Sequence, residues 1–322
     1  MRFIDHDEVR ERLTFEVCIP LVREAMVAFS AGRTRQTLRA IIPLQEHNAF
    51  GVMPGALGVD APFGAKLISV FPENFARGGP SHQGVIVIFD PMSGAPVCVV
   101  DAGEVTAIRT AAASAVATEA LARPGPARLA LLGYGEQATQ HLRAMAKVRP
   151  LASVVVWGRD PARAEAFAER MGGELGRPIE TAASAREAVA DAEIVCTLTP
   201  AREPILAGAW LRPGVHVNLV GSGYAAQAEA DGALIAAARL IADSREGVLV
   251  QCGEFLRAKA AGLVEDAHVA AEIGEVLAGA VPGRLSAGDI TVYKSLGHVV
   301  QDLVCAWALY SSRDGPGDGA PR

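Results

Sequence analysis

The stretch "ARLALLGYGEQATQHLRAM", residues 127–145, decides the fold because an apolar run leads into a glycine turn and then into a helical pattern. Gly133 and Gly135 provide the tight turn and the close backbone approach that a pyrophosphate requires, and Ala138 is the third small residue. The helix that follows would present free N–H groups and the positive end of its dipole to a phosphate. Because the turn closes a strand and opens a helix, it indicates a dinucleotide site rather than a plain tight turn.

From residue 128 onward, strand-like and helix-like segments alternate. The candidate strands are "RLALLG", "SVVVWG", "AEIVCTLT", "VHVNLVG" and "ARLIADS", with alanine-rich helices between them. This pattern is typical of an α/β fold with a doubly wound parallel sheet. The segment "DITVYKSLGHVVQDLVCAWALYSS" predicts a helix that starts after Asp289 and packs onto the first domain. The tail "RDGPGDGAPR" has no apolar anchor and is expected to be disordered.

The first 120 residues have a mixed pattern. Asp5 and Glu8 resemble a capping pair for a short helix, and a second helix is predicted to end near Gly32. Five short strands follow: "LRAIIPL", "AFGVMPGAL", "GAKLISVF", "GVIVIFD" and "APVCVVDAG". The segment "DPMSG" reads as a hairpin turn. An alanine-rich helix then stops at Pro124, so we place a domain boundary between residues 121 and 122.

Composition excludes several classes of protein. The chain has 322 residues, 50% of them hydrophobic and 20% charged, with a net charge of −6 and no basic cluster for nucleic acid or an anionic membrane. The charged N-terminus does not resemble a signal peptide, and no segment is apolar enough to span a membrane. Five widely spaced cysteines predict no disulfide framework and fit a reducing cytoplasm. The histidines and carboxylates show no metal-ligand spacing, so no metal is expected.

The end of the second strand of the parallel sheet indicates which cofactor is bound. In "VVVWGRDPARAEAF", Gly158 and Arg159 stand where an acid would bind the adenosine ribose. Arginine can pair with a 2′-phosphate, whereas an acid would repel it. NADP(H) is therefore favoured, and NAD(H) is the alternative because Asp160 follows directly.

Three basic residues of the first domain lie in apolar or small-residue surroundings: Arg39, Lys66 and Arg109. Each alone could be a snorkelling or surface side chain. No acidic partners are evident in the sequence, and burying three cations is costly, so together they predict a pocket for an anion.

The chain resembles the ornithine cyclodeaminase and mu-crystallin family. The resemblance rests on residues 64–124, the "GYGEQA" turn, "TLTPAREPIL" and "GDITVYKSLGHVVQDL", which occur in order over most of the chain. It implies a Rossmann domain at 122–295 and a split substrate-binding and dimerisation domain at 1–121, completed by 296–322, in a homodimer. It also implies that Arg39, Lys66 and Arg109 hold the carboxylate of an amino or imino acid. The cofactor-binding candidates are Gly133, Gly135, Glu136, Gln137, Ala138, Gly158, Arg159, Thr197, Thr199, Val220 and Gly221.

The family divides by chemistry, and one position separates its branches. Its cyclodeaminases carry an aspartate that handles the substrate amine, and in "HVNLVGSGYAAQAEAD" the corresponding residue is Gly223. Glu229 and Asp231 follow, and we interpret both as helix-start residues. A protonated cyclic ketimine already carries the C=N that accepts hydride, so a reductase depends less on a dedicated base than a deaminating enzyme does.

We therefore predict an NADPH-dependent reductase of a cyclic 2-imino acid. Arg39 and Arg109 would clamp the carboxylate, Lys66 would orient the substrate or donate a proton, and Ser81 and His82 are candidates for the pocket lining. Two alternatives remain open. The chain is a true ornithine cyclodeaminase whose base has moved, or it binds NADP(H) and a small ligand without turnover.

Overall fold

Two sheets, one mixed and one fully parallel, organise the chain. The computed structural model describes residues 1–45, 48–80 and 82–312. Unit 1 comprises Met1–Val17, Arg33–Thr106 and the segment from Val299 onward, and unit 2 comprises Cys18–Gly32 and Ala107–His298. The domain boundaries predicted at 121/122 and 295/296 refer to folding domains and stay a prediction.

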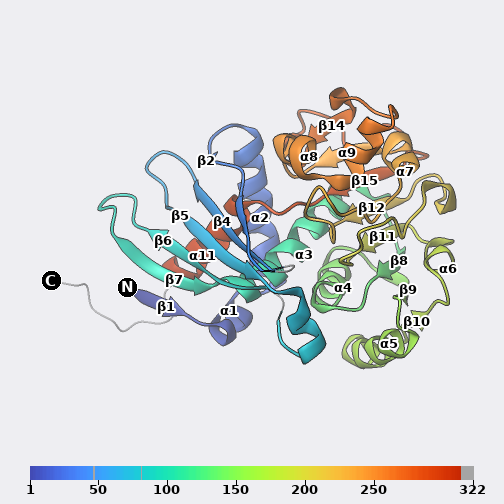
Figure 1. Cartoon of the computed structure of the whole chain (residues 1–322), viewed down its shortest axis with the longest axis horizontal. Helices are drawn as coiled ribbons and strands as arrows, with labels where there is room; N and C mark the ends of the chain where they lie inside the picture. Colours follow the sequence, from blue (N-terminus) through green and yellow to red (C-terminus); the bar gives the residue numbers. More distant parts are fainter. Residues whose placement is uncertain (46–47, 81, 313–322) are drawn as a thin grey trace. The chain divides into compact units, whose positions relative to one another are not determined.

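Unit 1 is a sheet in the order β1-β7-β6-β5-β4-β2, with β3 also paired to β4. β1 is parallel to β7, and the other neighbours are antiparallel. Its elements are β1 Arg2–Ile4, α1 His6–Arg12, β2 Arg35–Gln36, β3 Ala40–Pro43, β4 Ala49–Ala56, β5 Phe63–Val70, a 3₁₀ helix Pro72–Arg77, β6 His82–Phe89, β7 Pro96–Asp101 and α11 Val299–Ser311. Figure 1 shows the red α11 against the blue and teal strands of this sheet.

Side chains along the strands of unit 1 alternate between the face of the sheet that α11 covers and the opposite face. On β5, Gly64, Lys66 and Ile68 are buried, whereas Ala65 and Leu67 point to the opposite face and are half-buried. The five strands predicted between residues 38 and 103 are confirmed as β3 to β7. The capping pair is confirmed as well, because the Glu8 N–H donates to the Asp5 carboxylate at 2.9 Å.

Unit 2 is an eight-stranded parallel sheet in the order β10-β9-β8-β11-β12-β15-β13-β14. The elements outside unit 1 are α2 Phe15–Ser30, α3 Ala102–Leu121, β8 Ala127–Leu132, α4 Glu136–Val148, β9 Leu151–Trp157, α5 Pro161–Leu175, β10 Glu180–Thr181, α6 Ala185–Val189, β11 Ile194–Thr197, β12 His216–Leu219, α7 Gly232–Ala237, β13 Arg239–Ala242, α8 Arg245–Gln251, α9 Gly253–Ala260, β14 Val269–Glu272, α10 Ile273–Leu277 and β15 Thr291–Lys294, with short 3₁₀ turns at Gly208–Trp210 and Asp266–His268. The start of α2 and the first turn of α3 belong to unit 1. The predicted α/β class with a doubly wound parallel sheet is confirmed.

One prediction within unit 2 is wrong. The helix expected to start after Asp289 is preceded by a strand, β15, which lies between β12 and β13, and the helix α11 begins only at Val299. All four residues of β15 are buried, as expected for a central strand of a parallel sheet. A short run of this kind does not distinguish a buried strand from a buried helix by periodicity. Gly297, with φ of +81°, separates the two elements.

Two further expectations concern membranes and the tail. Among the described residues, no helix is both long and apolar enough to cross a membrane. The tail expected to be disordered, 313–322, lies outside the described residues.

Candidate functional site

The carboxyl end of β8 forms the glycine turn that the sequence predicts. Gly133 has φ of +128°, and a Cβ there would lie 2.7 Å from the Leu198 carbonyl oxygen, so only glycine fits. Gly135 is the N-cap of α4, and a Cβ there would meet no described atom within 4 Å. The buried Oε1 of Gln137, in the first turn of α4, has no hydrogen-bond partner among the described residues. An open backbone approach, a helix N-terminus and an unsatisfied buried oxygen together fit a dinucleotide.

The carboxyl end of β9 carries the residues predicted to choose the cofactor. Tyr134 lies across Gly158, where a Cβ would come within 2.1 Å of the tyrosine ring, so a side chain cannot be accommodated there without moving Tyr134. Arg159 is exposed at the end of the strand. Asp160 is the N-cap of α5, where its carboxylate accepts from the Arg163 N–H at 3.2 Å. The carboxylate that could have contacted a ribose therefore already has a structural role.

Glu229 joins the loops that follow β11 and β12. Its carboxylate accepts from the hydroxyls of Thr197 and Thr199 at 2.7 Å, from the Thr199 N–H at 2.6 Å and from the Gly221 N–H at 2.7 Å. Glu229 is fully buried, and burial raises the pKa of its carboxyl even though the threonine hydrogen bonds oppose this. The interpretation of Glu229 as a helix-start residue is wrong, because its four donors belong to the end of β11 and to the loops that follow β11 and β12.

The interpretation of Asp231 as a helix-start residue is confirmed. Asp231 is the N-cap of α7, and its carboxylate accepts from the Leu234 N–H at 2.8 Å and from the Gly208 N–H at 3.1 Å. Val220 and Gly221 continue β12 and both donate from their N–H groups to the Thr197 carbonyl oxygen, at 3.2 and 3.1 Å. The candidates Thr197, Thr199, Val220 and Gly221 thus lie together at this edge of the sheet.

A buried lysine at the end of β15 fixes the loop that contains Gly223. Lys294 donates to the carbonyl and hydroxyl oxygens of Ser222, both at 2.6 Å, and pairs with Glu254 at 3.3 Å. Burial opposes the charges of Lys294 and Glu254, but their mutual attraction outweighs it, so the pKa of Lys294 is raised and that of Glu254 is lowered. Sequence reasoning missed this pair, although a lysine inside the apolar "ITVYKSL" is the signal that could have found it.

Gly223 itself lies in the loop after β12, where its N–H donates to the Gln227 side chain at 3.2 Å. The neighbouring carboxylates all have partners. Glu229 binds the two loops, Asp231 caps α7 and Glu254 pairs with Lys294.

In unit 1, Lys66 projects from β5 toward α11. Its ammonium group donates to the Thr106 hydroxyl at 2.6 Å and to the Asp302 carboxylate at 3.2 Å, and both charged side chains are buried. The expectation that Lys66 has no acidic partner is therefore wrong. The partner was missed because it lies 236 residues away in the sequence.

Arg39 lies in unit 1 between β2 and β3, both of which pair with β4. Gln36 of β2 pairs with Gly55 and Ala40 of β3 pairs with Val52, so this segment holds one residue more than the facing segment of β4, and the pairing is irregular around Arg39. Arg39 is half-buried. His82 is exposed at the first position of β6, and the other lining candidate, Ser81, lies outside the described residues.

Arg109 lies on α3 and is 4% exposed. Its guanidinium packs against Gly297 of the turn after β15, where a Cβ would lie 2.8 Å from Nη1. Thr106, the partner of Lys66, precedes Arg109 by three residues on the same helix. Arg109 therefore does not occupy an ordinary surface position.

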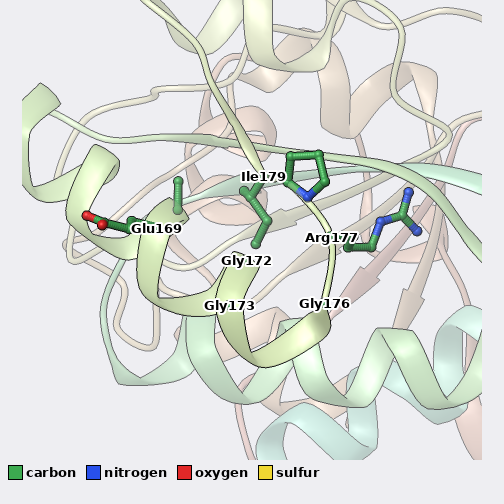
Figure 2. A pocket seen from close by; sticks show the side chains of 8 residues that line it. Glu169, Gly172, Gly173, Gly176, Arg177 and Ile179 are labelled. Carbon is green, nitrogen blue, oxygen red and sulfur yellow. The ribbon is translucent and has the colours of Figure 1, made fainter.

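A surface hollow of about 550 Å³ lies elsewhere in unit 2, at the end of α5. Figure 2 shows Glu169 and Arg177 at its two ends, with Gly172, Gly173 and Gly176 between them. Arg177 already donates to the backbone carbonyls of Leu151 and Ala152. The hollow brings together none of the candidate residues. In the part of the chain that the structure describes, no three His, Cys, Asp or Glu side chains gather as a metal site requires.

Comparisons with known proteins agree on one family. The model of the ornithine cyclodeaminase/mu-crystallin family matches residues 2–315. A ketimine reductase mu-crystallin from Rattus norvegicus is 36% identical over 315 residues, which is 96% of each chain. The structure of a Δ1-pyrroline-2-carboxylate reductase from Thermococcus litoralis, in complex with NADH and L-proline, superposes with a TM-score of 0.93 at 34% identity over 96% of each chain. An archaeal alanine dehydrogenase dimer with bound NAD superposes with a TM-score of 0.90 at 26% identity, over 96% of this chain and 95% of the other.

Proposed function

This chain belongs to the ornithine cyclodeaminase/mu-crystallin family, and from that premise we propose that it is an NADPH-dependent reductase of small cyclic 2-imino acids. Pyrroline-2-carboxylate and piperideine-2-carboxylate are the substrates we expect. The observation that carries the proposal is the glycine at position 223, which has no carboxylate to act as a base. The nearby carboxylates of Glu229, Asp231 and Glu254 already bind other groups of the chain. The rat and Thermococcus relatives, which are named as reductases of ketimine and pyrroline-2-carboxylate, support it.

The missing carboxylate favours reduction over oxidative deamination. An amino acid must lose an ammonium proton before hydride can leave its α-carbon, and this needs a base beside the nicotinamide. A protonated cyclic ketimine accepts hydride at its imine carbon and keeps its proton on nitrogen, so no base is required. Bound NADPH would supply the hydride.

The roles of the chain's own residues follow from their charges. Arg39 and Arg109 bind the substrate carboxylate, since guanidinium groups pair with carboxylates in a fixed two-pronged geometry. Lys66 orients the substrate, because the Asp302 carboxylate and the Thr106 hydroxyl hold its ammonium group at one point. His82 and Ser81 remain candidates for the pocket lining.

The cofactor is held in unit 2. Gly133 and Gly135 would allow the backbone at the start of α4 to approach the pyrophosphate, and the buried amide oxygen of Gln137 would accept from a donor on the cofactor, such as a ribose hydroxyl. Arg159 would pair with the 2′-phosphate, while Asp160 is engaged in capping α5. These features favour NADPH, although the two solved relatives contain NADH and NAD.

A panel of substrates tests the proposed reaction. NADPH oxidation is measured with pyrroline-2-carboxylate, with piperideine-2-carboxylate and with pyruvate plus ammonia, and ammonia release is measured with ornithine and NAD⁺. For the wild type we expect turnover of the cyclic imines and little or no conversion of ornithine. For Gly223→Asp we expect weak activity on ornithine. Ammonia release from ornithine at a rate rivalling imine reduction would identify a cyclodeaminase. Saturable NADPH binding without hydride transfer to any imine would identify a binding protein.

The enzyme is proposed to act as a homodimer. The face of the unit 1 sheet opposite α11 is apolar: by strand pairing it includes Phe3, Val99, Val87 and Ala65, and Phe3 is 64% exposed. A dimer would bury this face, because a large exposed apolar patch is typical of an interaction surface. The archaeal alanine dehydrogenase that superposes on this chain is named as a dimer. We expect the wild-type protein to have the mass of a dimer in light scattering and Val87→Lys that of a monomer. Val250→Lys, at an exposed position of α8, is the control.

The expected location is the reducing cytoplasm. All five cysteines are free and buried, and none forms a disulfide. Free, buried cysteines are typical of proteins in a reducing compartment, and this supports the expected location.

A further inference from the structure

A buried carboxylate defines the turn that follows β15. Asp243, directly after β13, is fully buried. Its Oδ2 accepts from the N–H groups of Leu296 and Gly297, at 2.6 and 2.7 Å, and its Oδ1 accepts from the Ser244 N–H at 2.8 Å. Its own N–H donates to the Lys294 carbonyl oxygen at 3.0 Å. Hydrogen bonds of this kind to a charged acceptor are stronger than neutral ones, so the backbone at 296–297 is held in one conformation.

This turn forms a wall against which Arg109 lies. A Cβ at Gly297 would come within 2.8 Å of Nη1, 3.1 Å of Nη2 and 3.4 Å of Cζ of the arginine. The φ of Gly297 is +81°, a conformation that other residues rarely adopt. Gly297 therefore meets two conditions at once, because it allows the backbone to turn and it leaves room for a guanidinium group.

We propose that Asp243 and Gly297 are positioning residues that fix the position of the guanidinium group of Arg109, and that they thereby set the preference for imines that carry a carboxylate. The inference rests on the proposed function and names a specificity device within that same site. A guanidinium binds a carboxylate through two parallel N–H donors only when both donors are correctly placed. A freely rotating arginine would lose side-chain entropy on binding, whereas one held against the 296–297 backbone has already lost it.

Gly297→Ala is the direct test. The first measurement is the Kd for pyrrole-2-carboxylate, an inert planar analogue, by calorimetry with NADP⁺ present. The second is the ratio of kcat/KM for pyrroline-2-carboxylate to that for 1-pyrroline, which has the same ring without the carboxylate. We expect the Kd to rise at least tenfold and the ratio to fall at least tenfold. The Kd for NADPH and the rate with 1-pyrroline should change less than twofold.

A matched control separates positioning from backbone strain. Gly262 also has positive φ, +71°, but a Cβ there would meet no described atom within 4 Å. Gly262→Ala carries the same conformational penalty without touching Arg109, so its Kd for the analogue and its rate ratio should remain those of the wild type. Asp243→Asn is a second variant with the same shape, and it should lower the ratio in the same direction as Gly297→Ala.

A double variant shows whether the effect passes through Arg109. In an Arg109→Lys background the wide guanidinium is absent, so adding Gly297→Ala should change the Kd for pyrrole-2-carboxylate less than twofold. The inference is overturned if Gly297→Ala leaves the Kd and the ratio unchanged, or if it slows 1-pyrroline as much as pyrroline-2-carboxylate. If the wild type reduces no imine, the proposed function fails, yet the Kd measurements with the analogue still decide the role of Gly297.

Discussion

The charge of one side chain, Arg159, is expected to set the choice of cofactor. It is exposed at the end of β9, and the neighbouring Asp160 is engaged in capping α5. We predict that the wild type binds NADPH at least tenfold more tightly than NADH, which corresponds to about 1.4 kcal/mol. Arg159→Asp should reverse this preference, because an acid binds the ribose hydroxyls and repels the phosphate. Fluorescence titration with both cofactors measures the ratio.

Arg186→Asp is the matched control for this prediction, since Arg186 is another exposed arginine of unit 2 and lies on α6. Its ratio of NADPH to NADH affinity should equal that of the wild type. Tighter or equal binding of NADH by the wild type would show that Arg159 does not contact the phosphate.

The conformation of the loops after β11 and β12 is expected to depend on Glu229. Its carboxylate accepts four hydrogen bonds from Thr197, Thr199 and Gly221. In Glu229→Gln, an NH₂ group would face some of these donors, and a buried unsatisfied group costs about 1–3 kcal/mol. We predict a lower Tm and at least a tenfold higher Kd for NADPH.

Glu203→Gln is the control, because Glu203 forms an exposed pair with Arg257. Unchanged NADPH binding in Glu229→Gln would show that the two loops do not hold the cofactor.

The ion pair between Lys66 of β5 and Asp302 of α11 allows the effect of a substitution on stability to be separated from its effect on substrate binding. Lys66 and Asp302 are both buried, and removing one partner of such a pair costs about 3–5 kcal/mol, whereas replacing both by apolar groups is often neutral. We therefore predict that Asp302→Leu alone is strongly destabilised and that Lys66→Met/Asp302→Leu regains most of the stability. The double variant should nevertheless fail to turn over pyrroline-2-carboxylate. Urea unfolding and NADPH oxidation are the two measurements, and full activity of the double variant would remove Lys66 from the site.

The stability of the whole molecule is expected to fall in mild acid. Burial lowers the pKa of His141 to about 4 and that of His216 to about 3, both from an ordinary value of 6.5. Below pH 6.5 the unfolded chain binds protons that the folded chain excludes, so the free energy of unfolding decreases as the pH falls. Each histidine should remove about 2 kcal/mol between pH 7.5 and pH 5.

Urea midpoints at pH 7.5 and pH 5 measure this loss. His141→Gln should reduce the loss by about 2 kcal/mol relative to wild type, because the proton uptake at this position disappears. Leu142→Ala, at a buried position of the same helix, is a control that lowers stability equally at both pH values. A His141→Gln protein with the wild-type loss would show that His141 is not responsible.

The sequence alone determined the features that depend on neighbouring residues. The turn at Gly133 and Gly135 was predictable because a strand, two glycines and a helix follow one another directly. Five of the seven strands described in unit 1, β3 to β7, were predictable as short apolar runs between turn residues, whereas β1 and β2 were missed. The caps at Asp5 and Asp231 were predictable from their place before a helix. The glycine at position 223, where a cyclodeaminase is expected to carry an aspartate, could also be identified from the sequence, because it concerns the residue type at a single position.

The tertiary structure decided whatever depends on partners distant in the chain. β15 is a strand only because β12 and β13 lie on either side of it, and its short apolar run does not reveal this. Asp302 reaches Lys66 across 236 residues, and Asp243 reaches Gly297 across 54. Such hydrogen bonds and ion pairs form only after the elements have packed, so local sequence patterns do not predict them. The candidate residues for the chemistry could therefore be named from the sequence, while the residues that hold them in place could be found only in the fold.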